Sequence, residues 1–312
     1  MEVEVSEENG VGPSPVAISL RKIIRGEVRE AEPLAAHTSF GIGGPALVMV
    51  FPLDTADLEW VLKTCHLHGT RVVLLGHGTN VLAPDEGLEA VVIKTTRLDG
   101  METDGLVVRA QAGISLGRVL GYALRAGLSG GEFMAGIPGT VGGAVAMNAG
   151  TRLGDMASVV ERVLVIAADG EGGLKEIDNV MAGFRYRSSR ISDEGMVVAG
   201  ATMRFLPGAV EDVKRRVEEI VDNRKRTQPL ELPSAGSVFK NPAGHSAGQL
   251  IEKAGCKGLR RGGACVSSLH ANFIVNMGEA RAKDILLLVD QVRERVKAYS
   301  GITLETEIRM LD

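Results

Sequence analysis

The sequence predicts an α+β fold divided among more than one compact unit. Its 312 residues exceed what a single hydrophobic core usually organises. Short apolar runs bounded by glycine or acidic residues recur as far as about residue 205, and such runs are typical of strands. Amphipathic helical stripes interrupt these runs and follow them. The mixture of both patterns in one long chain is the basis of the fold prediction.

Composition and charge narrow the class of partner. A hydrophobic content of 45% with 24% charged residues is globular, and a net charge of -4 provides no bulk attraction to phosphate backbones, so we expect no nucleic acid partner. Three cysteines without a CxxC pair argue against a disulfide framework and a zinc site, and we expect no metal. The acidic start does not resemble a signal peptide, and no apolar run is long enough to span a membrane. We therefore predict a cytoplasmic protein.

The elements of the first two thirds can be placed in order. Residues 1 to about 15 lack periodicity and are predicted to be a mobile tail. Two helices are predicted, each followed by a glycine in the position that ends helices. Strands and helices are expected at Val72–Leu75, Val91–Ile93, Met196–Val198, Thr55–His68 and Leu116–Ala126.

The pattern changes after Pro207. A charged helix follows, with Val210, Val213, Val217, Ile220 and Val221 on one stripe, and we expect it to open a new domain. A second helix is predicted over Ala282–Ser300, ending at Gly301. The closing segment alternates Ile302, Leu304, Thr306 and Ile308, which predicts a strand with its acidic residues on the other face.

The strongest chemical signal is the segment GIPGTVGGAVAMNAG from Gly136 to Gly150. Glycines permit positive φ and let neighbouring N–H groups converge on an anion, so the segment could bind a diphosphate. Its spacing, with Pro138 inside, does not match the G-x-G-x-x-G pattern of nicotinamide-binding Rossmann domains. Taken alone, a tight structural connection is an equally good interpretation.

A second glycine loop, Gly76–Asn80, follows the predicted strand Val72–Leu75, and loops after strands often bind ligands. His77 in this loop is more often an ordinary turn residue than a base or a flavin anchor. The neighbouring Cys65, His66 and His68 fall inside a predicted helix, where residues adjacent in sequence do not face one another, so a metal site is not expected there.

Two further segments, FRYRSSRIS at Phe184–Ser192 and SAGSVFKNP at Ser234–Pro242, occur in order with the glycine loops. HTSFGIGGPA, from His37, precedes them and LETEIR closes the set. The ordered set resembles the UDP-N-acetylenolpyruvoylglucosamine reductase family, also called UDP-N-acetylmuramate dehydrogenase. The resemblance runs from about His37 to near the end of the chain.

The resemblance implies an FAD-binding module of the vanillyl-alcohol-oxidase type, in two subdomains, followed by an α+β substrate-binding domain. The implied division is 16–207 for the module, with a boundary near 90, then 208–300 for the substrate domain and 301–312 for a terminal strand that returns to the active site. FAD would be bound non-covalently, with NADPH as hydride donor. The cofactor residues implied are Thr38, Gly43, Gly44, Gly76, Gly78, Thr79, Asn80, Gly136, Pro138, Gly139, Thr140, Gly142, Gly143 and Asn148.

The resemblance also implies the reaction, which is reduction of the enolpyruvyl ether of a UDP-sugar to UDP-N-acetylmuramate for peptidoglycan synthesis. Arg187 would stabilise the charge that develops beside the substrate carboxylate, Ser237 would donate a proton, and Glu307 would position or polarise the same end of the substrate. Without the family pattern, the three would be read as a surface ion-pair residue, a turn serine and an exposed strand acid. Substrate contacts are implied for Tyr186, Lys240 and Asn241.

The chain departs from the family pattern after Gly150, where TRLGD stands in place of a segment that carries a tyrosine in many relatives. Arg152 could substitute by pairing with a substrate phosphate. The stretch from Phe184 to Asp222 is too short for a tyrosine-bearing insertion, which indicates the shorter subtype. Another FAD-linked oxidoreductase of the same fold, or a non-catalytic flavin-binding module, remain alternatives, and the oligomeric state is not indicated.

Overall fold

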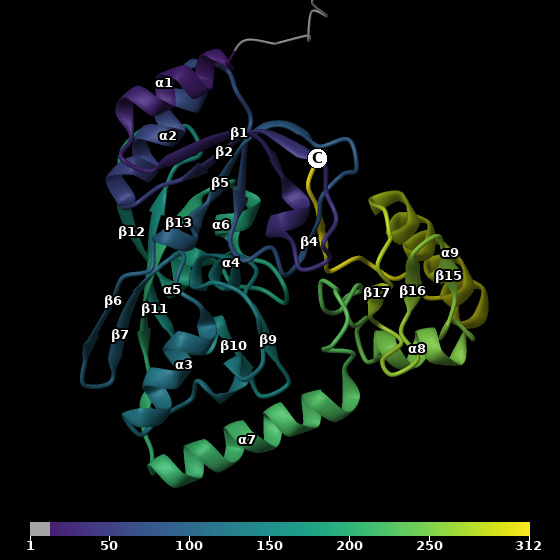
Figure 1. Ribbon diagram of the computed structural model, residues 1–312. Coiled ribbons are helices and arrows are strands. Elements are labelled where there is room, and N and C mark those ends of the chain that lie inside the picture. Colours follow the sequence, from purple (N-terminus) through teal and green to yellow (C-terminus); the bar gives the residue numbers. More distant parts are fainter. Residues whose placement is uncertain (1–12) are drawn as a thin grey trace, which may run out of the picture.

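A computed structural model describes residues 13–312 of the chain, so most of the predicted tail lies outside the described residues. Its first layer is a mixed sheet in the order β1-β2-β5-β3, in which β1 and β2 are antiparallel and the other pairs are parallel. Helices α1 and α2 pack on one face, around a core that includes Leu20, Leu62 and Val91 (Figure 1). The elements are α1 (Pro15–Ile23), β1 (Glu27–Pro33), β2 (Pro45–Phe51), α2 (Thr55–Leu67), β3 (Val72–Leu75), β4 (Val81–Leu82) and β5 (Leu88–Lys94).

The second layer is an antiparallel sheet in the order β12-β11-β13-β7-β6. Its core contains α3 and α4 side chains such as Val119 and Val145, packed with Val163 and Met203 of the strands. The main elements are β6 (Met101–Asp104), β7 (Val107–Gln111), α3 (Leu116–Arg125), α4 (Val141–Ala146), β11 (Val160–Ile166), β12 (Lys175–Asp178) and β13 (Val197–Arg204). Short pieces between them are β8 (Leu128–Ser129), β9 (Gly150–Thr151), β10 (Gly154–Asp155), α5 (Asn179–Ala182), α6 (Arg190–Asp193) and β14 (Leu206–Pro207).

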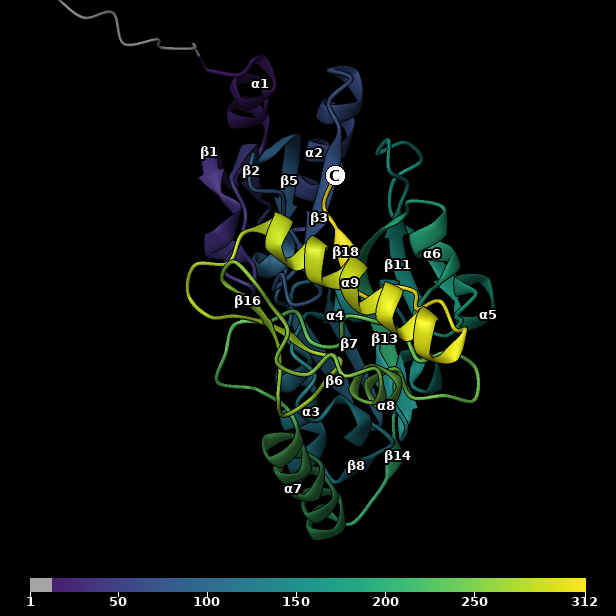
Figure 2. The ribbon, with the colours of Figure 1, turned by 90° about the vertical axis from the view of Figure 1, so that its right-hand side faces the viewer.

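The C-terminal unit packs two helices on a small antiparallel sheet of order β15-β16-β17. Figure 2 shows α9 crossing the front of this unit. Its core also takes in Phe40, Ile42 and Leu82, so the C-terminal unit packs against the first part of the chain. The elements of this unit are α8 (Ala247–Lys253), β15 (Arg260–Arg261), β16 (Ala264–Val266), β17 (Ile274–Asn276) and α9 (Ala282–Ser300). Helix α7 (Val210–Thr227) precedes it, and β18 (Arg309–Met310) follows it.

Helix ends follow the sequence signals closely. Helix α2 begins after Asp54, whose side chain accepts a hydrogen bond from the N–H of Asp57 at 2.9 Å, and it ends just before Gly69 at φ +59°. Helix α9 ends at Gly301, at φ +74°. The helices predicted at 55–68, 116–126 and 282–300 are confirmed to within one residue. Among residues 13–312, no helix combines the length and the apolar character needed to cross a bilayer.

Helix α7 differs from the expectation that it opens a new domain. Figure 1 shows it running along the lower edge of the molecule toward the C-terminal unit. Its inward residue Val217 belongs to the core of the second sheet, and Arg216 pairs with Glu132 at 2.7 Å. An apolar stripe identifies the buried face of a helix but carries no information on which layer covers it.

The closing segment was predicted to be a regular strand, and this is only partly correct. Leu304 and Ile308 are buried, but the pairing before β18 is a single bridge between Phe239 and Thr306. Strand β18 then pairs in parallel with β4. The chain end therefore returns to the first part of the chain, where it forms a separate two-stranded sheet with β4. Residue 90, near which a subdomain boundary was predicted, lies inside β5.

Candidate active site

One cavity of about 510 Å³ lies where the two glycine loops, the C-terminal unit and the chain end meet. This volume falls within the range of roughly 300–1,000 Å³ that is usual for ligand sites. The predicted residues that line it are Gly76, Gly78, Thr79, Asn80, Pro138, Gly139, Thr140, Gly142, Gly143, Arg187, Ser237 and Glu307. Both glycine loops and all three predicted catalytic residues thus share one cavity.

The loop Gly76–Asn80 turns sharply after β3. Gly78 has φ +68°, and a Cβ at this position would lie 2.1 Å from the carbonyl oxygen of His37, so only glycine fits. Among the described residues, the backbone N–H groups of His77, Gly78 and Thr79 have no protein acceptor. Unpaired N–H groups at the edge of a cavity suit the oxygens of a diphosphate.

The second glycine segment packs directly against the first. A Cβ on Gly76 would lie 2.4 Å from the Thr140 hydroxyl oxygen, and the Thr79 hydroxyl donates to the carbonyl of Pro138 at 3.1 Å. Gly142 approaches Ala112 so closely that a Cβ would lie 2.8 Å from its side chain. The two segments form one continuous wall of the cavity, with backbone exposed along it.

Five predicted cofactor residues do not line the cavity, and they support the wall from behind. The Thr38 hydroxyl donates to the carbonyl of Ile42 at 2.8 Å, which shapes the turn that packs against Gly78. At Gly43 and Gly44 a Cβ would lie within 2.6 Å of Ala83 and 2.4 Å of the Asp85 carbonyl, respectively. These three positions are required for close backbone packing. Gly136 packs against Arg224.

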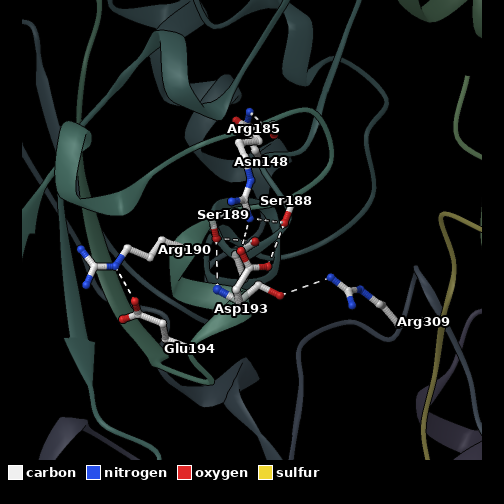
Figure 3. A network of polar contacts seen from close by, with 10 residues as sticks. Asn148, Arg185, Ser188, Ser189, Arg190, Asp193, Glu194 and Arg309 are labelled. Atoms are coloured by element: carbon white, nitrogen blue, oxygen red, sulfur yellow. Dashed lines mark hydrogen bonds and ion pairs between the residues drawn. The ribbon is translucent and has the colours of Figure 1, made fainter. Parts of the chain in front are cut away.

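The fifth, Asn148, is a buried brace with φ +43°. Its amide nitrogen donates to the carbonyl of Arg185 at 3.0 Å and to Asp155 at 3.1 Å, while its oxygen accepts from the N–H of Ala157 at 2.9 Å. Figure 3 shows it beside the polar network that Arg185, Ser188 and Asp193 form around α6. Asn148 therefore holds the turn that carries Arg187.

That turn places Arg187 at the cavity. Arg185 and Ser188 pair through two backbone hydrogen bonds of 2.9 and 3.1 Å, and Arg187 between them adopts φ +54°. This conformation costs a non-glycine residue on the order of 1 kcal/mol or more and persists only where the surroundings enforce it. The Arg187 Nη2 donates to the carbonyl of Gly150 at 2.7 Å, which directs the guanidinium into the site.

Arg187 and Glu307 meet, although 120 positions separate them: Nε of Arg187 donates to Oε1 of Glu307 at 2.6 Å. Both side chains are 17% exposed. Burial raises the pKa of Glu307, and the positive charges of Arg187 and Lys240 oppose this shift without cancelling it. The predicted proximity of the two residues is confirmed.

Ser237 reaches the same place through the backbone. The N–H of Glu307 donates to the carbonyl of Val238 at 2.7 Å, so the segment that carries Ser237 lies alongside the chain end. The side-chain amide of Asn80 donates to the carbonyl of Glu307 at 3.2 Å. Arg309 donates to the hydroxyl of Ser192 at 3.2 Å, and Figure 3 shows this contact between the chain end and α6. Hydrogen bonds of the chain end thus connect the segment that carries Ser237 with the Gly76–Asn80 loop and with α6.

A buried amide that the sequence analysis missed holds the Ser237 segment. The side chain of Asn272, 4% exposed, accepts from the N–H of Phe239 at 3.0 Å and donates to its carbonyl at 2.8 Å. Its own carbonyl accepts from the N–H of Val238 at 2.8 Å. Three bonds to two consecutive residues fix the backbone next to Ser237.

The predicted substrate contacts do not line the cavity. The N–H of Asn241 donates to the Tyr186 hydroxyl at 3.3 Å, and the Tyr186 ring lies 5.0 Å from the Arg187 guanidinium carbon. Lys240 Nζ lies 3.5 Å from Oε2 of Glu305, which is 78% exposed. Tyr186, Lys240 and Asn241 therefore gather beside the catalytic residues. Arg152 is exposed between β9 and β10 and does not line the cavity.

Lys94, at the end of β5, is a buried cation that the sequence analysis missed. Its ammonium donates to the carbonyl of His37 at 3.3 Å, directly behind the Gly78 turn, and the side chain has no ion-pair partner among residues 13–312. Burial lowers the pKa of Lys94 to about 8. The pKa of His77, which lines the cavity, is lowered by its own desolvation and then by the charge of Lys94.

This burial predicts a pH-dependent stability. Below pH 8 Lys94 is charged in both the folded and the unfolded protein. Between pH 8 and 10.5 only the unfolded protein keeps the proton, so the free energy of unfolding should rise with pH in that window. Lys94→Met, in the FAD-free protein, should raise the free energy of unfolding at pH 7 by up to roughly 3 kcal/mol. Urea unfolding measured from pH 7 to 10 should show that the stability gained by Lys94→Met decreases as the pH rises. Lys22→Met, a control at an exposed position, should leave the free energy of unfolding unchanged. An advantage that is constant with pH would contradict the assignment.

Comparisons with known proteins agree with this geometry. A family model described as the C-terminal domain of UDP-N-acetylenolpyruvoylglucosamine reductase matches residues 228–311. A second, described as an FAD binding domain, matches residues 46–172. A UDP-N-acetylenolpyruvoylglucosamine reductase of Symbiobacterium thermophilum is 43% identical over 95% of this chain and 97% of its own length. The corresponding protein of Heliobacterium modesticaldum is 44% identical over 92% of this chain and 91% of its own length.

Solved structures lead to the same family. The chain matches the UDP-N-acetylenolpyruvylglucosamine reductase of Thermus caldophilus with a TM-score of 0.79 and 38% identity, over 93% of this chain and all of that one. A berberine bridge enzyme variant, 16% identical over 63% of this chain with a TM-score of 0.50, shares the fold of the flavin module. The predicted vanillyl-alcohol-oxidase type of module is confirmed. The chain therefore belongs to the UDP-N-acetylenolpyruvoylglucosamine reductase family.

Proposed function

We propose that Arg187, Ser237 and Glu307 carry out the reduction of UDP-N-acetylenolpyruvoylglucosamine to UDP-N-acetylmuramate in this chain. The chain is an FAD-dependent oxidoreductase that uses NADPH as reductant. The observation that carries the assignment of residues is the Arg187–Glu307 ion pair, which lies in the same cavity as Ser237 and both glycine loops.

The residues present fit FAD. The unpaired N–H groups of the Gly76–Asn80 loop would hold the diphosphate, and the wall from Pro138 to Gly143 would hold the remainder along the cavity. When bound, FAD supplies a hydride that it accepts from NADPH and delivers to the methylene carbon of the substrate. Thr38, Gly43, Gly44 and Asn148 act by keeping this wall in shape.

Arg187 stabilises negative charge on the substrate. Hydride addition to the terminal carbon of the enol ether leaves charge on the adjacent carbon and its carboxylate. A guanidinium donates parallel hydrogen bonds to a planar carboxylate and stays charged at any working pH. Glu307 and the carbonyl of Gly150 hold the Arg187 side chain in one orientation, so little reorganisation is needed when the substrate binds.

Ser237 completes the addition by donating its hydroxyl proton to the carbon next to the carboxylate, and solvent returns that proton to the serine. Hydride and proton together saturate the double bond. Glu307 polarises the same end of the substrate through Arg187. Its raised pKa lets the carboxyl carry a proton nearer neutral pH than an exposed glutamate does.

The substrate's UDP portion extends toward Tyr186, Lys240 and Asn241, which gather beside the catalytic residues. Residues 16–207 constitute the flavin module. We place the division between its two subdomains between β5 and β6, because β5 is the last strand of the first sheet along the chain. We assign residues 208–300 to the substrate domain, although the inward face of α7, at its start, packs on the second sheet of the flavin module, and residues 301–312 return to the site. The reaction supplies a peptidoglycan precursor in the cytoplasm.

Steady-state kinetics tests this function. Purified protein should oxidise NADPH only when UDP-N-acetylenolpyruvoylglucosamine is present, and UDP-N-acetylmuramate should form in equal amount. NADPH oxidation that depends on oxygen instead would favour another oxidoreductase of the same fold. Tight FAD binding with no turnover under either condition would favour a non-catalytic flavin-binding module.

A further inference from the structure

Ser237 lines the cavity, yet it takes part in no hydrogen bond within residues 13–312. The residue before it, Gly236, has φ +73°, and nothing lies within 4 Å of where its Cβ would be. A glycine in open space leaves the backbone free to rotate just before the serine. A general acid must reach its target atom at hydrogen-bond distance, so the direction of the Ser237 hydroxyl depends on the residues that follow it.

The residues after Ser237 are held from two edges, and the first edge is the chain end. The N–H of Glu307 donates to the carbonyl of Val238 at 2.7 Å, and the N–H of Lys240 donates to the carbonyl of Glu305 at 2.9 Å. Both bonds lie along one side of the segment. On their own they would leave the segment able to turn about that side, and Ser237 would swing with it.

Asn272 supplies the second edge. Its side-chain amide bonds both backbone groups of Phe239, at 3.0 and 2.8 Å, and its carbonyl accepts from the N–H of Val238 at 2.8 Å. The side chain thus does for Phe239 what a neighbouring strand would do. Because Asn272 is only 4% exposed, water does not compete for these bonds. With both edges bonded, the segment cannot turn.

The turn that carries Asn272, between β16 and β17, is itself braced. The Ser267 hydroxyl accepts from the N–H groups of Leu269 and His270 at 3.1 and 3.3 Å. The N–H of Phe273 donates to the carbonyl of His270 at 2.9 Å, and the N–H of Ser267 donates to the carbonyl of Phe273 at 2.9 Å. Finally, the N–H of Asn272 donates to Nδ1 of His270 at 3.3 Å. The amide therefore projects from a rigid support.

We propose that Asn272 is a positioning residue for proton transfer, which directs the Ser237 hydroxyl at the substrate carbon by fixing Phe239 and Val238. Asn272 is not among the residues that line the cavity, so it acts through the serine segment and not on a ligand. This inference rests on the proposed function, in which Ser237 donates the proton. Protonation occurs only when the reduced flavin is oxidised by the UDP-sugar, so Asn272 should matter in that half-reaction and not in flavin reduction by NADPH.

Asn272→Asp tests the role with almost no change of shape. An ionised carboxylate still accepts from the N–H of Phe239 but cannot donate to its carbonyl. Oxidation of the reduced flavin by the UDP-sugar should slow roughly 10²-fold, the cost of a misplacement of about 1 Å. Flavin reduction by NADPH should keep its wild-type rate. Stopped-flow absorbance of the flavin, recorded without oxygen, measures both rates.

A pH series of the same variant provides a rescue. A protonated carboxyl can donate to the Phe239 carbonyl as the amide does, so the deficit relative to wild type at the same pH should shrink as the pH falls. The titratable neighbours, His270 and the Lys240–Glu305 pair, are present in both proteins, and their effects cancel in this comparison. Asn272→Ser, which is too short to bond both groups and carries no charge, should show the same selective loss without this recovery.

Asn276→Asp is the matched control, because Asn276 is a buried amide in β17 whose side chain does not contact the serine segment. Its Nδ2 donates to the carbonyl of Phe40 at 2.9 Å, and its Oδ1 accepts from the N–H of Gly278 at 2.8 Å. The change should lower the free energy of unfolding, since it also removes a buried donor. It should leave the ratio of the two half-reaction rates at the wild-type value.

The double variant with Ser237→Ala separates positioning from a general loss of structure. Once the hydroxyl is absent, Asn272→Ser should slow the substrate half-reaction little further, because the group that it orients is gone. The full cost in the Ser237→Ala background would overturn the inference. Equal slowing of both half-reactions in the two Asn272 variants, or no slowing in either, would do the same. Wild-type reduced flavin that the UDP-sugar does not oxidise would instead overturn the proposed function.

Discussion

Ser237→Ala should leave the reduction of bound flavin by NADPH almost unchanged and should slow the oxidation of reduced flavin by the enolpyruvyl sugar. Protonation of carbon occurs only in the second of these half-reactions. A positioned general acid contributes roughly 10²- to 10⁴-fold, and the loss should lie in that range. Stopped-flow absorbance of the flavin, recorded without oxygen, measures both rates separately.

Ser234→Ala is the matched control, because it lies in the same segment and its contact with Ser39 is made by the backbone carbonyl, which alanine retains. It should leave both half-reactions at the wild-type rate. If Ser237→Ala slowed the two half-reactions equally, the serine would be acting on flavin binding or on the local fold, and the proton-donor role would be lost.

Arg187→Lys should lower the rate of the substrate half-reaction by roughly 10²- to 10³-fold, the cost of removing a fixed donor at a developing charge. A lysine keeps the positive charge but cannot donate to Glu307, to the Gly150 carbonyl and to the substrate in one plane. Arg185→Lys changes an exposed arginine of the same turn, and it should have little effect.

Arg187→Lys and Glu307→Gln should also be non-additive. The two side chains share one hydrogen bond of 2.6 Å and act on one end of the substrate, so the second change should cost less once the first has been made. The single variants and the double variant, compared by single-turnover rates, give the coupling. Costs that multiply independently would show that the ion pair seen here does not act as a unit in the reaction.

The sequence was informative where a residue type is required by the backbone or by a reaction. Gly78 and Gly142 allow close approaches that any Cβ would block, and both line the cavity as their motifs suggested. The helix ends at Gly69 and Gly301 follow from the same conformational freedom. Arg187, Ser237 and Glu307 were identified through the resemblance, since an isolated arginine, serine or glutamate carries no such signal.

Other features depend on tertiary packing and could not be predicted. The apolar stripe on α7 marked the buried face of this helix but not the layer that the face covers. The sequence therefore did not indicate that Arg224 and Gln228 line the cavity. Asn272 and Lys94 look like ordinary polar residues in sequence, and only their burial shows that one braces Phe239 and the other lies behind the Gly78 turn. The prediction of a terminal strand was only partly correct, because alternating apolar residues can also be buried by side-chain packing in a segment that pairs through a single bridge.

The visible spectrum of the wild-type protein, recorded without oxygen through one cycle, tests the central claim most directly. The purified protein should be yellow from non-covalently bound FAD, addition of one equivalent of NADPH should bleach it, and addition of UDP-N-acetylenolpyruvoylglucosamine should restore the colour as UDP-N-acetylmuramate appears. A protein that cannot be loaded with FAD, or one whose bleached flavin is reoxidised by oxygen but not by this sugar, would contradict the account.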